Sequence, residues 1–351
     1  MINDLRALAE LTAHGVELDM ERVLLSPASP LTDALASRVS FGNMGAETFV
    51  LYANGRKSRA LGVVQARPRK NRPEADITFI APSLEHDPDA VTTWYRLLSE
   101  ATNSFGETGV QRIYAQLPSG NGTEQVFQQA GFSVFTREDI FLLSASKSAE
   151  FIKARQAVSN GGNPRLTLRR MRKRDGWNVL RLYSAVTPRN VQHSEAMRTT
   201  EGALGTLADW WENSNGTSYL LERPDGGTNS LTGIVRVTRG RLGSWVRLHV
   251  YPDALPSADE MVAEMIAFVS KTRARPIYVG VRDYEGGIRA ALESAGFEWQ
   301  MERSHMVKHT TVRVRVPVPW LAPVFETKKI PAIRASHKVQ VTGNSQSIHQ
   351  I

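Results

Sequence analysis

The stretch VQRIYAQL at residues 110–117 has a counterpart in the second half of the chain, RPIYVGVR at residues 275–282. Each copy is followed by a polar turn, a short helical pattern and an Ala-Gly-Phe triplet, at 130–132 and 295–297. The spacing between the two Gly-Phe pairs, from 131 to 296, and the spacing between the two Ile-Tyr pairs, from 113 to 277, differ by a single position. Because these two marks agree so closely, the sequence predicts a duplicated domain.

The patterns around these anchors predict the same order of elements in both copies. In the first copy the sequence predicts strands at 48–52, 60–66 and 75–81, a helix over 88–105, the strand at 110–117 and a short helix that ends near 130. In the second copy it predicts a strand at 166–169, helices over 176–186 and 202–211, strands at 219–222, 231–237 and 245–251, a helix over 259–272 and the strand at 275–282. After Gly-Phe, each copy is predicted to close with a pair of strands.

The length of 351 residues is large for one hydrophobic core, which agrees with a duplication. We expect an N-terminal domain at 1–150, a linker at 151–164, a C-terminal domain at 165–315 and a flexible basic tail at 316–351. The linker ends in Ser-Asn-Gly-Gly-Asn-Pro at 159–164, a composition that does not support regular structure.

The composition is typical of a soluble globular protein, with 41% hydrophobic and 22% charged residues. There is no run of about 18 apolar residues, and the chain does not open with a basic segment followed by an apolar one. The absence of cysteine excludes disulfides, thiolate nucleophiles and cysteine metal sites, and the eight histidines are not at metal-ligand spacing. We therefore expect a cytoplasmic protein that has no metal and no membrane partner.

The formal net charge of +8 raises the question of an anionic partner, because Lys and Arg residues that neutralise phosphates drive nucleic-acid binding. A basic cluster at 165–174 opens the second copy, and Trp177 is the one aromatic residue beside it. Solvated basic surface explains this cluster as well. Nucleic-acid binding is therefore the weaker alternative.

The predicted order of elements resembles that of the GCN5-related N-acetyltransferases (GNATs). This order is an antiparallel meander, a helix, a strand, a short helix, and Gly-Phe with closing strands. The resemblance covers most of 41–145 and of 165–312. It implies an α+β fold (an α/β sandwich) of two tandem acyl-coenzyme A N-acyltransferase-like domains, each with a mixed, mostly antiparallel central sheet flanked by helices. It also implies transfer of an acetyl or other acyl group from acetyl-coenzyme A or another acyl-coenzyme A to an amine. The cofactor would lie between two splayed strands, 75–81 with 110–117 or 245–251 with 275–282.

Both copies depart from this family at the loop that holds the pyrophosphate of the cofactor. GNATs carry Arg/Gln-x-x-Gly-x-Gly/Ala there, whose backbone N–H groups bind the phosphates at a helix N-terminus. The corresponding segments, 83–89 and 253–259, contain proline and acidic residues and no glycine. The Asn and Tyr that the family places before Gly-Phe are also incomplete: the first copy has Asn121 and Phe127, and the second has Gly286 and Leu292. Both active sites are thus expected to be degenerate.

The second copy offers the better candidate for chemistry. Arg247, His249 and Tyr251 alternate along the predicted strand at 245–251, so their side chains are expected to share one face and to be the catalytic residues. His249 is the expected base, because the pKa of histidine lies near neutrality. A structural strand histidine is the alternative to that role. By the resemblance, cofactor contacts are expected at Val250, Tyr251, Ser257, Ala258 and Asn121.

Two functions from different classes remain open. The first is an N-acyltransferase that uses the second copy and an unknown small-molecule or peptide amine as acceptor. The second is a catalytically inactive tandem GNAT-fold module for binding or assembly. The sequence also leaves open whether the chain forms a homo-oligomer.

Overall fold

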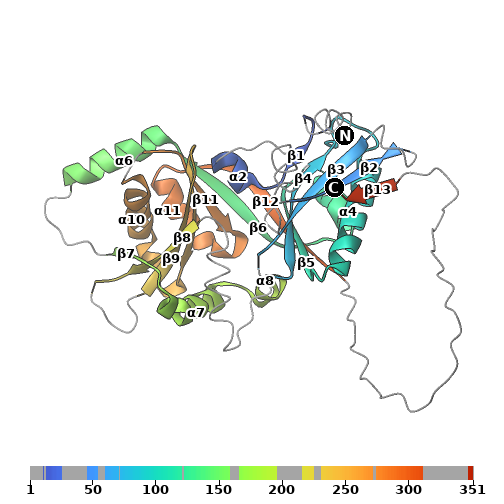
Figure 1. Ribbon diagram of the computed structural model, residues 1–351. Helices are drawn as coiled ribbons and strands as arrows, with labels where there is room; N and C mark the ends of the chain where they lie inside the picture. Colours follow the sequence, from blue (N-terminus) through green and yellow to red (C-terminus); the bar gives the residue numbers. More distant parts are fainter. Residues whose placement is uncertain are drawn as a thin grey trace, which may run out of the picture.

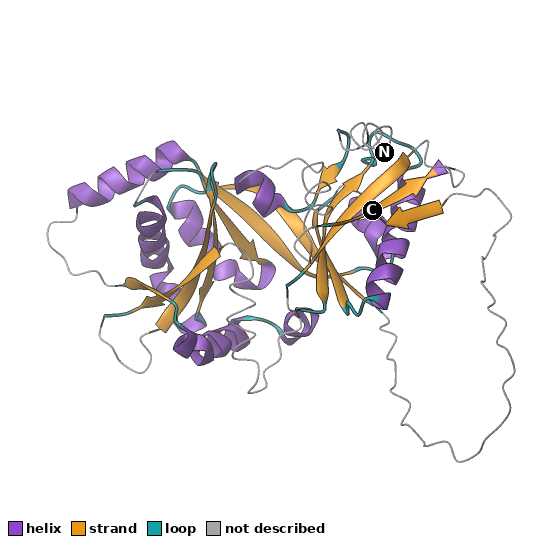
Figure 2. Ribbon diagram, in the orientation of Figure 1, coloured by secondary structure: helices purple, strands orange, loops and turns teal. Residues whose placement is uncertain are grey.

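The computed structural model describes residues 11, 13–25, 46–53, 60–70, 72–120, 122–158, 166–195, 216–224, 231–271, 274–310 and 347–350. One sheet runs through both halves of the described chain, in the order β13-β2-β3-β4-β5-β12-β6-β11-β10-β9-β8-β7 (Figure 1). Helices flank this sheet, which confirms the predicted mixed, mostly antiparallel architecture (Figure 2). None of the described helices has the length and apolar character that crossing a lipid bilayer requires.

The first half follows the predicted order of elements. They are β1 (Val16–Glu17), α2 (Met20–Leu25), β2 (Glu47–Tyr52), β3 (Ala60–Pro68), β4 (Glu74–Ala81), α4 (Ala90–Glu107), β5 (Arg112–Pro118), α5 (Thr123–Gln129), β6 (Ser133–Leu143) and α6 (Ala145–Val158). The predicted strands and the long helix of this half begin and end within two residues of those observed. The short strand β1 was not predicted.

The second half repeats this order. Its elements are β7 (Thr167–Arg170), η2 (Lys173–Asp175), α7 (Gly176–Val186), α8 (Arg189–Ser194), β8 (Gly216–Glu222), β9 (Leu231–Arg239), β10 (Ser244–Val250), η3 (Pro252–Ser257), α10 (Ala258–Ser270), β11 (Ile277–Arg282), η4 (Asp283–Ile288), α11 (Arg289–Ser294) and β12 (Glu298–His309). The predicted helix at 202–211 lies outside the described residues. Most of the predicted tail also lies outside the described residues. The part that is described, β13 (Ser347–Gln350), pairs with β2.

Each half packs one long helix on its sheet. In α4, Trp94 and Phe105 are fully buried in the core of the first half. In α10, Met261, Met265 and Ile266 follow the predicted helical spacing and are fully buried in the core of the second half. Burying a side chain of this size contributes about 1.5–3 kcal/mol, so these helices fix the two sheet halves in place.

The closing strands differ from the prediction, because each half ends in one long strand instead of a pair. β12 leaves the second half and pairs with β5 of the first, from Arg303 opposite Pro118 to His309 opposite Arg112. β6 leaves the first half and pairs with β11 of the second, from Ile277 opposite Leu143 onward. β6 and β12 also pair with each other, antiparallel. The two halves have therefore exchanged their last strands.

The physical reason for this difference lies in the turns and in the sheet edges. Neither Ser133–Leu143 nor Glu298–His309 contains a glycine or proline, so neither segment has the residues that favour the tight turn of a hairpin. A single long strand in each half would expose an unpaired edge, and exposed edges invite aggregation. Exchange gives both strands a partner on each side.

A buried ion cluster lies where β6, β11 and β12 run beside one another. Arg303 on β12 donates from Nε to Oε2 of Glu138 on β6 at 2.6 Å, and both side chains are 1% exposed. Nε2 of His305 lies 2.9 Å from the same oxygen, and Nε of Arg282 on β11 lies 3.6 Å from Oε1. Gly280 makes room for this carboxylate, since a Cβ there would collide with Oε1 of Glu138. The cluster thus connects strands that come from both halves.

The variant Glu138→Gln is expected to lower the free energy of unfolding by about 3–5 kcal/mol, because it leaves buried cations without their counter-charge. The matched control is Glu302→Gln on β12, whose half-exposed carboxylate pairs with Arg137 at 2.8 Å. An exposed pair of this kind contributes about 0–1 kcal/mol. Urea unfolding measures both values. Equal, small losses in the two variants would show that the buried cluster does not hold the exchanged strands.

The same cluster sets a pH dependence of stability. Burial, and after it the charge of Arg282, lower the pKa of His305 well below its ordinary value of 6.5, so His305 is neutral when folded. Burial alone would raise the pKa of Glu138, but Arg303 and then Arg247 outweigh it and hold that pKa well below 4.5. The contribution of the Glu138 carboxylate to the free energy of unfolding is therefore lost only when the pH falls well below 4.5. Between pH 7 and pH 5 the unfolded chain binds the additional proton at His305, so the free energy of unfolding decreases as the pH decreases.

We expect the variant His305→Gln to flatten this decline by up to about 1.4 kcal/mol per pH unit, because one proton is removed from the unfolding equilibrium. Chemical denaturation at pH 7, 6 and 5 measures the slope. His193→Gln, on the exposed side of α8, is the control and is expected to keep the wild-type slope. A wild-type slope in both variants would assign the acid sensitivity to other groups.

Candidate functional site

Each half contains a pair of parallel strands that separate. β4 and β5 pair only from Glu74 opposite Arg112 to Asp76 opposite Tyr114. β10 and β11 pair only from Ser244 opposite Ile277 to Arg247 opposite Gly280. Both pairs open after these residues, as the resemblance implies. The gap in each pair is the place where the family holds its cofactor.

In the first half, β1 pairs with the edge of β4 that β5 leaves, and Figure 1 draws β1 beside β4. Val16 pairs with Ile80 on the part of β4 that has left β5. On either side of β1, the N–H of Leu18 donates to the carbonyl of Thr78 at 2.8 Å, and the N–H of Ser83 donates to the carbonyl of His14 at 2.7 Å. Leu18 is 2% exposed in the core of this half. The free edge of β4 is therefore already used by the chain itself.

The gap of the second half is not crossed by any strand among the described residues. Its mouth lies between η3 and η4. Leu255 of η3 packs on the backbone of η4, since a Cβ on Gly287 would lie 2.9 Å from the Leu255 methyl carbons. This contact narrows the route by which a long cofactor would enter.

The residues of η3 do not suit a pyrophosphate. Pro252 and Pro256 have no N–H group, and the N–H of Ala254 already donates to the carbonyl of Tyr251 at 2.9 Å. Asp253 in η3 and two acidic residues in the first turn of α10 bring negative charge to the same place. Three of the six residues of η3 therefore have no free N–H group to offer a pyrophosphate.

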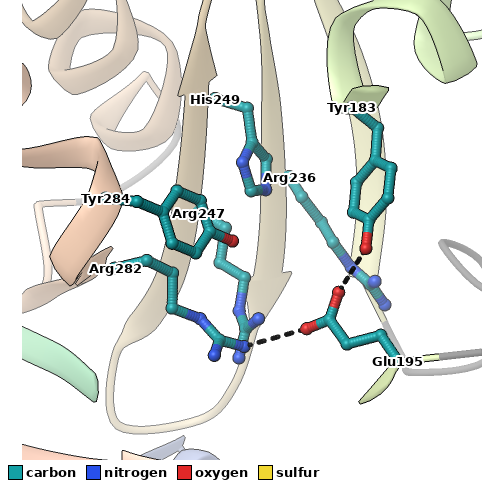
Figure 3. Close-up of a pocket in the computed structure, with 7 residues that line it drawn as sticks. All are labelled: Tyr183, Glu195, Arg236, Arg247, His249, Arg282 and Tyr284. Atoms are coloured by element: carbon teal, nitrogen blue, oxygen red, sulfur yellow. Dashed lines mark hydrogen bonds and ion pairs between the residues drawn. The ribbon is translucent and has the colours of Figure 1, made fainter. Parts of the chain in front are cut away.

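A pocket lies on the opposite face of β10 (Figure 3). Val246, Leu248 and Val250 face the core below α10, so Arg247 and His249 face the other side. The cavity has a volume of about 60 Å³. We call it the arginine pocket, and it is lined by Tyr183, Glu195, Arg236, Arg247, His249, Arg282 and Tyr284.

His249 is oriented by a carboxylate. Its Nδ1 atom lies 2.5 Å from Oε1 of Glu285 in η4. The other oxygen of Glu285 accepts a hydrogen bond from the backbone N–H of Arg282 at 3.3 Å. An ionised carboxylate only accepts hydrogen bonds, so the Nδ1 atom carries a proton that points to Glu285. This arrangement of histidine and carboxylate is one that proton transfer requires.

Glu195 holds the other side of the pocket. The hydroxyl of Tyr183 on α7 donates to its Oε2 atom at 2.7 Å, and Nη2 of Arg282 lies 3.5 Å from its Oε1 atom (Figure 3). Burial, and then the charge of Glu195, raise the pKa of Tyr183. Burial also raises the pKa of Tyr284. Both tyrosines are therefore neutral hydroxyl groups at physiological pH.

Arg236 and Arg247 are directly opposite each other on β9 and β10. Burial, and then the positive charge of Arg247, lower the pKa of Arg236 to about 10. Two guanidinium groups in one pocket repel each other, and a bound anion would relieve that repulsion.

The structure brings together some of the predicted site residues and separates others. Arg247 and His249 line the pocket, as their alternation predicted. Tyr251 does not line it, because β10 ends at Val250 and the backbone turns into η3, so Tyr251 packs on the hydrophobic core. Among the predicted cofactor contacts, Val250 and Ala258 are buried, Ser257 precedes α10, and Asn121 lies outside the described residues.

The remaining pocket residues were missed because they come from other elements. Arg236 and Arg282 sit in predicted inner strands, and a charged residue in such a strand was a signal that could have found them. Glu195, Tyr183 and Tyr284 follow no pattern of their own in the sequence. In the basic cluster, Arg169 forms ion pairs with Asp175 and Glu222 of the same chain, at 2.8 Å each.

No model of a known protein family matches this sequence, and no curated protein matches it. Solved structures are similar at low identity. A GCN5-related N-acetyltransferase from Sphaerobacter thermophilus is 11% identical, with 88% of this chain and 93% of that chain covered and a TM-score of 0.47. A tandem GNAT protein from the clavulanic acid biosynthesis pathway is 12% identical, with 88% and 95% covered and a TM-score of 0.46. A functionally unknown conserved protein from Staphylococcus epidermidis is 10% identical, with 70% and 91% covered and a TM-score of 0.48.

These TM-scores lie below 0.5, so the likeness to GNATs rests on the strand order of this chain and on its two splayed pairs.

The variant Leu18→Ala is expected to lower the free energy of unfolding by about 2–5 kcal/mol, because it removes the buried side chain that follows β1. Val91→Ala, at a position that is 43% exposed on α4, is the control and should change it by less than about 0.5 kcal/mol. Urea unfolding compares the two. A loss at Leu18 as small as the control's would mean that the N-terminal segment is only loosely held in the gap.

Proposed function

We propose that this chain is a GNAT-fold binding protein that takes a ligand in the arginine pocket of its second half and has no acyl-coenzyme A site of the usual kind. The observation that carries the proposal is the pairing of β1 with β4. With β1 in place, the chain itself occupies the gap in which the family holds its cofactor. In this reading the first half is structural.

In the first half, a cofactor would have to displace the chain's own strand. Backbone hydrogen bonds of the kind that flank β1 contribute about 0.5–1.5 kcal/mol each. Burial of Leu18 adds about 1.5–3 kcal/mol. Displacement would therefore cost several kcal/mol before the cofactor gained any binding energy.

In the second half, the obstacle is charge and backbone chemistry. The loop that would face the pyrophosphate has two prolines and acidic residues on and after η3. Two like unit charges about 4 Å apart near a protein surface repel by about 4 kcal/mol. The pocket behind this loop, in contrast, is rich in arginine. The second half is therefore better suited to an anion in the pocket than to a pyrophosphate at η3.

Acyl transfer to an amine in the second half is the second candidate function. The observation that favours it is the pair His249 and Glu285, which could accept a proton from an acceptor amine. This candidate requires Leu255 to move away from Gly287. Only this candidate function involves an acceptor amine and an acyl group.

Calorimetric titration with acetyl-coenzyme A separates the two candidates. We expect no saturable heat up to about 1 mM ligand, which would correspond to a binding free energy weaker than about 4 kcal/mol. Saturable binding near one site per chain would overturn the proposal and favour acyl transfer. In that case His249→Ala is the informative variant, because a base is expected to affect turnover with amines and to leave acetyl-coenzyme A affinity unchanged.

A further inference from the structure

We infer that the arginine pocket binds the oxoanion group of a small molecule, a carboxylate or a phosphate, and that Arg247 and Arg282 hold it. This inference rests on the proposed function in one respect, that the pocket of the second half is the ligand site. It goes further by naming the chemical group that the pocket recognises and the residues that recognise it.

Arg282 is the first part of the argument. It is 6% exposed, and its Nη1 atom is buried with no hydrogen-bond partner among the described residues. Its carboxylate contacts are long, 3.6 Å to Glu138 and 3.5 Å to Glu195. A buried donor that is left unsatisfied costs about 1–3 kcal/mol, and more when it is charged. A ligand oxygen beside Nη1 would remove this cost.

Arg247 is the second part. Its Nη2 atom lies 3.9 Å from Oε1 of Glu138, the same oxygen that Arg282 approaches at 3.6 Å. That oxygen makes no hydrogen bond to any described residue. Glu138 uses its other oxygen for Arg303 and His305. Two guanidinium groups thus lie near one oxygen without donating a hydrogen bond to it, and Nη1 of Arg282 remains available to a ligand.

The surroundings of these two arginines indicate an anion of limited size. Arg236 stands opposite Arg247 and adds positive charge, partly balanced by Glu21 on α2. A cavity of about 60 Å³ is several times the roughly 10–15 Å³ that a single water molecule needs. It accommodates a carboxylate or phosphate group and leaves the rest of the ligand near the mouth. Planar guanidinium groups suit both anions, because they can donate two parallel hydrogen bonds.

The remaining polar groups of the pocket would contact the rest of the ligand. Figure 3 shows His249 and Tyr284 on the side of the pocket away from Glu195. The Nδ1 atom of His249 is used by Glu285, 2.5 Å away, so Nε2 is the other polar atom of the ring. The Tyr284 hydroxyl is neutral, because burial raises its pKa. The pocket therefore offers arginine donors at one end, and a tyrosine hydroxyl and an imidazole ring at the other.

Thermal-shift and calorimetric titrations of the full chain with sodium acetate, sodium glycolate and inorganic phosphate test the inference, with sodium chloride at matched ionic strength as the reference. We expect a saturable rise in Tm with the carboxylates or with phosphate, and none with chloride. The stronger series identifies the group: carboxylates point to an organic acid, and phosphate points to a phosphate monoester. No shift beyond that of chloride would overturn the inference.

Variants locate the site. Arg247→Gln is expected to weaken the oxoanion affinity at least about tenfold, because charged hydrogen bonds are lost. Arg247 is 23% exposed and lies 3.9 Å from Glu138, so this variant is expected to fold, whereas Arg282→Gln removes a side chain that is 6% exposed and lies closer to Glu138. The matched control is Arg289→Gln on α11, a half-exposed arginine paired with Asp139 and Glu293 outside the pocket. It should leave the affinity unchanged within twofold.

Other outcomes overturn the inference. Oxoanion binding that Arg247→Gln leaves intact would place the anion elsewhere on the protein. Binding of a single-stranded oligonucleotide in place of the small anions, with a steep dependence on salt, would favour the nucleic-acid alternative. If acetyl-coenzyme A binds and Arg247→Gln does not change that binding, the proposed function is overturned. The inference of an oxoanion site in the arginine pocket is not affected by that result. The two failures are therefore distinguishable.

Discussion

Pairing between β6 and β12 is the interaction on which the rest of this structure depends. The two strands lie at the centre of the sheet, and each is the last strand of the half opposite to the one that it completes. Their pairing makes one sheet out of two repeats and places Glu138 beside arginines from both β11 and β12. The arginine pocket borders this buried cluster, because Arg282 contributes to both. A change at the centre of the sheet is therefore also a change at the candidate site.

Most of the local structure could be predicted from the sequence, because hydrophobic periodicity and turn residues act over short distances. The helix at 176–186 and the buried face of α10 follow directly from such patterns. The exchange of strands could not be predicted in this way, because alternation determines the face of a strand and not its partner. β1 was missed for a related reason. So short a strand has no period, and the need for Gly15 before it comes from the Phe79 and Ala81 side chains, which a Cβ there would meet.

The candidate site shows the same division. Arg247 and His249 share a strand, so their common face could be predicted from spacing alone. Arg282, Glu195 and Tyr183 meet them only through tertiary packing, from β11, the end of α8 and α7. Tyr251 shows where the pattern stops, because alternation ends with the strand. The two duplicated halves also differ at their splayed strands. In the first half β1 pairs with β4, and in the second half the arginine pocket lies beside β10.

The exchange of strands has a consequence for the order of events during synthesis. β5 ends at Pro118, but its partner β12 ends at His309, so the whole stretch between these two positions must be synthesised before the pair can close. At a synthesis rate of about 5–20 residues per second, this stretch takes roughly 10–40 s. During that interval the first half has emerged with an open sheet edge and cannot finish folding. The nascent chain therefore has a period in which a chaperone, or the edge of another nascent chain, can compete with its own last strand.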